Sequence, residues 1–179
     1  TGVGRTIGTA VVVTAVGSAL FVENNTVENI SPRVVYVFLW VIVPLASFVV
    51  GDVWRWLSPF EMIAALGDRR LTVPAATDHA DVGSFTLLAP AAALLVFHWV
   101  ELAYHAPATT PVLAALLLVW VGAGVYNAAR YGSVGLRSRD PLAVWCRLLA
   151  AGSPTFVRNG RWRLRVPFVG LADVPAQRG

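Results

Sequence analysis

The sequence is poor in charge and in sulfur. Charged residues make up 13% of its 179 residues, whereas a soluble globular domain carries about 25%. The single cysteine, Cys146, excludes a disulfide bond within the chain and a cysteine-based metal cluster. Because so few ionic groups leave too little polar surface to cover a globule, the shortage disfavours a soluble all-helical core, which is the alternative. It favours a chain whose apolar surface lies in lipid.

Lysine is absent as well, so that all 14 basic residues are Arg, and the formal net charge is +4. A basic balance can indicate nucleic-acid binding. Here, however, the Arg residues flank apolar runs, where they suit the anionic headgroups of a membrane. We therefore expect the lipid bilayer as a partner and no nucleic acid.

Hydrophobic residues make up 56% of the chain and gather in long runs. A helix needs roughly 20 apolar residues to cross a bilayer, and in lipid a helix satisfies every backbone hydrogen bond within itself. The predicted spans are Thr6–Val22, Val34–Val50, Phe85–Tyr104 and Pro111–Asn127. The predicted fold class is an all-α membrane protein with about four transmembrane helices.

The placement of Arg predicts the orientation of these spans. Arg residues precede the first run and follow the second and fourth runs, whereas the connection before the second run carries only Arg33 and the connection HAPATT carries none. Positively charged loops stay in the cytoplasm. We therefore expect a multi-pass protein of the cell membrane, with both termini of this segment in the cytoplasm.

Two shorter amphipathic helices are predicted in the cytoplasmic interface, one after each pair of spans. Each begins at a capping residue followed by proline, Ser58-Pro59 in the first case and Asp140-Pro141 in the second. The recurrence suggests an internal repeat of residues 6–67 and 85–152 with the same topology in both halves, although a chance match is the alternative. Near the first cap, Asp52, Arg55 and Glu61 could form an ion-pair cluster.

A small β-hairpin is predicted near the C-terminus. Asn159-Gly160 separates two β-prone runs, which is a strong hairpin signal. Apolar residues alternate there with Arg161, Arg163 and Arg165, so that one face would be apolar and the other cationic. A hairpin resting on anionic headgroups fits this pattern, and an RNA-binding strand is the alternative.

The candidate chemical site lies in the third run. His98, Glu101 and His105 are spaced i, i+3 and i+7, which places them within about 60° of arc on one helix face. Ionisable residues inside a span are costly and usually face a bundle interior or a water-filled cavity. The three residues could bind Zn or another divalent metal, or they could relay protons. The alternative is that His105 lies among the outer headgroups, and that His98 and Glu101 only form hydrogen bonds with neighbouring helices.

Three stretches resemble a family of prokaryotic polytopic membrane proteins that carries the label fenitrothion hydrolase. They are Trp54–Pro59, Trp99–Leu102 and Asp140–Leu142, and the resemblance covers Val34–Phe168. It implies hydrolysis of an organophosphate ester, and it implies a longer chain with more spans. Glu101 matches a position of the family, whereas the two neighbouring histidines do not.

Three functions remain open on this sequence. In a hydrolase, Glu101 and His98 would be the catalytic residues and would hold a metal or activate water. In a transporter or ion-handling subunit, Glu101 would lie on the pathway. A scaffold would need no chemistry. We expect residues 1–179 to form a single polytopic domain, a fragment of a longer chain, whose partners are further helices of that chain or a second copy.

Overall fold

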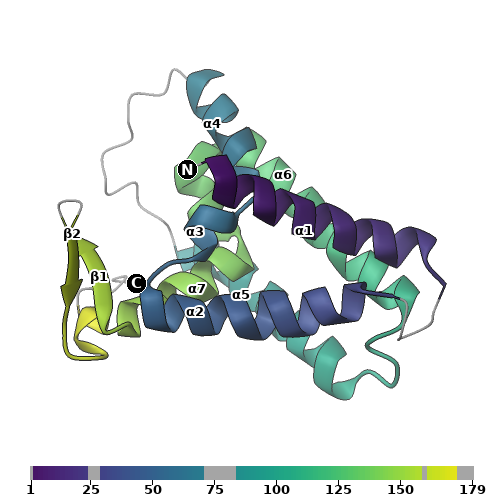
Figure 1. Ribbon diagram of the computed structural model, residues 1–179. Helices are drawn as coiled ribbons and strands as arrows, with labels where there is room; N and C mark the ends of the chain where they lie inside the picture. Colours follow the sequence, from purple (N-terminus) through teal and green to yellow (C-terminus); the bar gives the residue numbers. More distant parts are fainter. Residues whose placement is uncertain (1, 24–28, 71–83, 159–160, 173–179) are drawn as a thin grey trace.

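The structure is a computed structural model that describes residues 2–23, 29–70, 84–158 and 161–172. Helices dominate it (Figure 1). In chain order the elements are α1 (Gly2–Phe21), η1 (Arg33–Ile42), α2 (Val43–Val50), α3 (Trp54–Leu57), α4 (Phe60–Arg70), α5 (Ser84–Ala103), α6 (Thr110–Arg139), α7 (Pro141–Gly152), β1 (Thr155–Arg158), β2 (Arg161–Leu164) and η2 (Val169–Leu171).

Three helical rods in the described part of the chain are long and apolar enough to cross a membrane. They are Gly2–Phe21, Arg33–Val50 and Thr110–Arg139. The second rod joins η1 to α2 without a break, because Ile42 and Val43 both keep helical backbone angles. The remaining predicted span is present as the 20-residue helix α5, whose apolar stretch with described side chains runs over Leu87–Ala103. Its crossing of a membrane stays a prediction.

The helices α1 and η1–α2 form an antiparallel pair (Figure 1). Where the C-terminal end of α1 meets the start of η1, the Asn29 side chain accepts a hydrogen bond from the Ser18 hydroxyl at 2.7 Å and donates one to the Ser18 carbonyl at 3.2 Å. The start of α6 joins this end, where the Asn29 amide lies 3.4 Å from the Thr110 hydroxyl. Leu113 and Leu117 of α6 are buried there against α1 and η1.

The helix α6 runs twelve residues beyond the predicted end of its span at Asn127. It also changes direction, because Gly132 has a left-handed φ of 64° and a ψ of −163°. Glycine adopts this conformation without steric cost. The turn brings the segment after Gly132 back toward the bundle, and the chain enters α7 from there.

The two short amphipathic helices are present, and each packs against a long helix from the other half of the chain. The helix α4 packs along α6, where the Phe60 ring lies against Gly124. The helix α7 packs along α2, with Trp145 stacked 6.3 Å from Trp40 of η1. Each short helix therefore contacts the long helix of the other half of the chain. The interfacial position predicted for them does not follow from these contacts.

The predicted hairpin is confirmed. Strands β1 and β2 are antiparallel, with Thr155 opposite Leu164 and Arg158 opposite Arg161. The Asn159-Gly160 turn lies outside the described residues. Arg165 is not free for headgroups as the alternation suggested: its guanidinium donates to the carbonyls of Ala150, Ala151 and Ser153 and so caps the C-terminus of α7.

Glycine permits the closest approach between α1 and α3. A Cβ atom on Gly8 would overlap the backbone carbonyl of Leu57, whereas a Cβ atom on Gly17 of the same helix would meet nothing within 4 Å. We predict that Gly8→Ala lowers the free energy of unfolding by about 1–3 kcal/mol, as overpacking does. Gly17→Ala should leave it unchanged or slightly higher. Thermal unfolding of both variants in one detergent measures the difference, and equal Tm values would contradict the packing.

Candidate functional site

The residues predicted to carry chemistry are not brought together as a trio. The helix α5 ends at Ala103, so that His105 lies beyond it, exposed, with its ring centre 4.5 Å from that of Tyr104 in a tilted arrangement. His98 lies 2.8 Å, through Nδ1, from the Leu94 carbonyl and packs edge-on against Trp40. Glu101 is half-buried and interacts electrostatically with Tyr36. Within the described residues, no group of three or more His, Cys, Asp or Glu side chains could hold a metal ion. The catalytic assignment of Glu101 and His98 stays a prediction.

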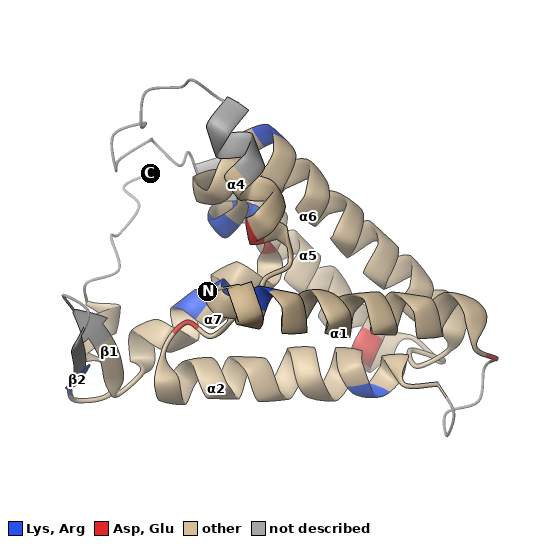
Figure 2. Ribbon diagram, turned by 45° about the horizontal axis from the view of Figure 1, so that its top comes forward, with Lys and Arg blue, Asp and Glu red and all other residues tan. Residues whose placement is uncertain are grey.

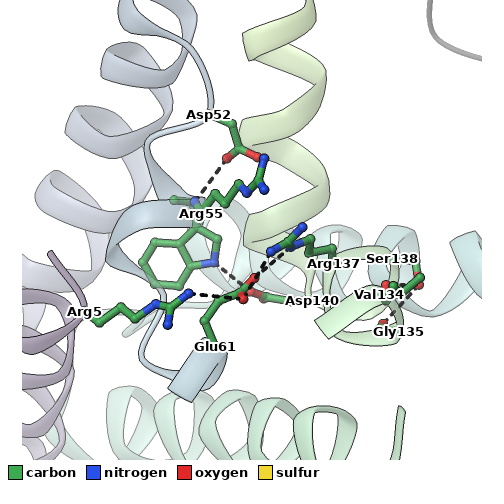
Figure 3. Close-up of polar contacts among 10 residues, drawn as sticks. Arg5, Asp52, Arg55, Glu61, Val134, Gly135, Arg137, Ser138 and Asp140 are labelled. Atoms are coloured by element: carbon green, nitrogen blue, oxygen red, sulfur yellow. Dashed lines mark hydrogen bonds and ion pairs between the residues drawn. The ribbon is translucent and has the colours of Figure 1, made fainter. Parts of the chain in front are cut away.

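A denser polar cluster lies where α3, α4, α6 and α7 meet (Figure 3). Its centre is Asp140, the N-cap of α7, whose side chain is 2% exposed. The carboxylate accepts hydrogen bonds from the indole N–H of Trp54 at 2.7 Å, from the indole N–H of Trp120 at 3.1 Å and from the Leu142 amide at 3.2 Å. The capping role predicted for Asp140 is confirmed, and the two indoles add a tertiary role.

Glu61, in the first turn of α4, is the second buried carboxylate. Arg137 donates to both of its oxygens, from Nε at 2.8 Å and from Nη2 at 3.2 Å, and Arg5 of α1 approaches to 3.7 Å. A two-point Arg–carboxylate pair of this kind is strong and directional. The sequence suggested that Glu61 pairs within its own segment near Asp52 and Arg55. The structure gives it Arg partners from α1 and α6 instead (Figure 3).

A cavity of about 20 Å³ lies between these groups, which is room for one water-sized occupant. Both helix N-termini reach it, through Ser58 ahead of α4 and Asp140 ahead of α7. Ser58 is 3% exposed, and its hydroxyl has no hydrogen-bond partner. Arg55 and Arg147 line the same cavity and are exposed, so that the cavity has a buried floor and a charged mouth.

The electrostatics of the cavity favour negative charge in it. Its lining holds three Arg and three acidic side chains, and each helix N-terminus adds roughly half a positive charge. Burial raises the pKa of Asp140, although its indole and amide donors oppose the rise. Burial also raises the pKa of Asp52, against the opposing effect of the Arg55 amide and guanidinium. Protonation of either carboxyl would leave the cavity more positive.

Part of this site can be predicted from sequence patterns. Ser58 and Glu61 have the spacing of a capping box, in which a serine cap is followed by glutamate three residues later. The Ser58-Pro59 and Asp140-Pro141 pairs also predict where α4 and α7 begin. The pairings themselves carry no local signal, because Arg137 lies 76 residues from Glu61 and Trp54 lies 86 residues from Asp140.

The chain matches no family model, no curated protein and no solved structure at a significant level. The site therefore rests on its own geometry.

We predict that Asp140→Ala is strongly destabilising. It removes the α7 cap, which contributes about 1 kcal/mol, and leaves the buried indole N–H of Trp54 without an acceptor, at a cost of about 1–3 kcal/mol. Asp52→Ala is the matched control, because Asp52 is half-buried and its side chain accepts a hydrogen bond from the Arg55 amide at 3.2 Å. Thermal unfolding in detergent should show a much larger loss for Asp140→Ala. A larger loss for Asp52→Ala would contradict the anchoring role.

Proposed function

We propose that this chain is a multi-pass membrane protein that handles ions, and that the cavity between the α4 and α7 N-termini binds a small anion. The observation that carries the proposal is the Ser58 hydroxyl, which is buried at this cavity without a partner. A buried hydroxyl of this kind normally has a hydrogen-bond partner. A bound anion would supply the acceptor.

An anion fits the site better than a cation. Helix N-termini present backbone N–H groups and a positive dipole end, which bind anions. Arg55 and Arg147 at the mouth attract the same charge. Two of the three lining carboxylates already have donors of their own, because Arg137 occupies both oxygens of Glu61 and the indole and amide donors occupy Asp140.

The cavity lies at the Arg-rich end of the bundle. Glu61, which lines it, pairs with Arg5 near the start of α1, and Asp52, which also lines it, follows shortly after the end of the second apolar rod. Its exposed Arg55 and Arg147 would meet an anion that arrives from the aqueous side of that end. Helices that direct their N-termini at an anion recur in transporters.

The exchange of short helices between the two halves supports the internal repeat. In each half, two long helices precede a short helix with a proline at its start, and each short helix packs along the second long helix of the other half. A pseudo-twofold relation between the halves would place both N-termini at one shared cavity. We therefore retain residues 6–67 and 85–152 as the two repeat units.

The Arg-rich end of the bundle faces the cytoplasm in this proposal. In Figure 2 basic positions lie around α4, α7 and the start of α1 and on the hairpin at β2, whereas Arg33 lies at the opposite end of the α1/η1–α2 pair, at the start of η1. This bias is typical of the cytoplasmic side, and it places the cavity mouth there. Ester hydrolysis, which the family resemblance implies, stays a prediction attached to Glu101 and His98.

We predict that the purified protein conducts chloride when it is reconstituted in vesicles, and that Ser58→Ala lowers the flux roughly tenfold through the loss of one hydrogen bond to a charged ligand. Ser138→Ala is the matched control, because Ser138 is also buried but its hydroxyl donates to the Gly135 carbonyl at 3.0 Å. A chloride flux in vesicles with the wild-type protein that is no higher than in protein-free vesicles would refute the proposal. Equal chloride fluxes for Ser58→Ala and Ser138→Ala would refute it as well.

We also predict that chloride binds more tightly as the pH falls. The pKa values of Asp52 and Asp140 are raised by burial, so that these carboxyls take up protons above the pH at which an ordinary aspartate does. Each proton removes a negative charge beside the anion. Asp52→Asn should therefore bind chloride more tightly than wild type at neutral pH and should show a weaker pH dependence. Titration of chloride at several pH values measures both effects, and tighter binding at higher pH would contradict the charge assignment.

A further inference from the structure

A second, larger cavity opens between η1, α5, α6 and α7. Its volume is about 490 Å³, which is within the range of ligand pockets of about 300–1,000 Å³. Nearly all of its lining is apolar, with Val35, Phe97 and Leu117 at one end. It shares Trp120 and Leu142 with the packing around Asp140 but lies on the apolar side of them. We call it the apolar cleft.

The other end of the apolar cleft is polar. Asn127 of α6 and Arg139 line it there. The Arg139 guanidinium lies 4.0 Å from the centre of the Tyr131 ring, which fixes its position. Neither of the ion pairs found in the described part of the chain includes Arg139, since both belong to Glu61. A positive group at the end of a long apolar slot complements an amphiphile with an anionic head.

The dimensions of the apolar cleft match one leaflet of a bilayer. From Leu116 to Asn127 the lining of α6 extends eleven residues, about 16 Å. Half of a hydrocarbon layer of about 30 Å is nearly the same length. The polar end lies at the end of α6 that the Arg distribution assigns to the cytoplasm. A lipid of that leaflet would therefore place its head at Arg139 and one acyl chain along the cleft.

We infer that the apolar cleft is a binding site for an anionic phospholipid of the cytoplasmic leaflet. The phosphate interacts with Arg139 and the Asn127 amide, and an acyl chain fills the space between α5 and α6. The inference uses the proposed orientation but not ion transport, so that loss of chloride flux would leave it standing. It accounts for a volume that a close-packed helical bundle would not leave empty.

The test is native mass spectrometry of the detergent-purified chain titrated with phosphatidylglycerol and, separately, with phosphatidylcholine. We expect a single tight site that prefers phosphatidylglycerol. Arg139→Gln should weaken phosphatidylglycerol binding roughly tenfold, as expected for the loss of a charge-assisted contact. Phosphatidylcholine binding should change less.

Arg130→Gln is the matched control. Arg130 also lies on the Tyr131 ring, at 5.5 Å, but it does not line the cleft, and it should keep wild-type lipid binding. A second variant, Ala123→Trp, fills the cleft from an exposed position and should remove tight binding of both lipids. Equal affinity of the wild type for the two lipids would overturn the inference. Equal losses of phosphatidylglycerol affinity in Arg139→Gln and Arg130→Gln would overturn it as well. The same holds if the wild type binds no lipid but forms a dimer, and if Ala123→Trp abolishes that dimer.

Discussion

The buried carboxylate of Asp140 holds the two halves of the molecule together. It caps the start of α7, and it accepts hydrogen bonds from the indole N–H groups of Trp54 in the first half of the chain and Trp120 in the second. A charge this deeply buried is tolerated only when its hydrogen bonds are made. The requirement fixes the positions of α3, α6 and the α7 N-terminus together, and the cavity at Ser58 exists because those positions are fixed.

Local pattern was enough to predict most of the elements: the Asp140 cap and the hairpin are present, and the long helices cover the predicted apolar runs, although α6 continues twelve residues beyond its predicted end. It was not enough to predict how they assemble. Gly132 kinks α6 through its positive φ, and no pattern around this residue distinguishes it from a helical glycine. The Glu61–Arg137 pair joins residues 76 positions apart. The sequence therefore directed attention to Glu101, an ionisable residue within a span, whereas the carboxylates and Arg side chains of the denser polar cluster come from positions outside the predicted spans.

The two cavities divide the molecule by polarity. The smaller one gathers Arg and carboxylate side chains around two helix N-termini, and the larger one is an apolar slot with a single guanidinium at its polar end. Asp140 and its tryptophans stand between them. An ion and a lipid would therefore act on the same structural anchor from opposite sides, which offers a physical route by which membrane composition could alter ion binding.

The docking of α7 along α2 can be tested with the only cysteine in the chain. Cys146 is buried in α7 and interacts with the Ser47 side chain of α2. Ser47→Cys, expressed in native membranes and treated with a membrane-permeant oxidant, should form a disulfide bond with Cys146. Ser18→Cys, at the far end of α1, should not. If the Ser47→Cys variant forms no disulfide under conditions that oxidise a reference cysteine pair in the same membrane, α7 does not lie beside α2 and the account fails.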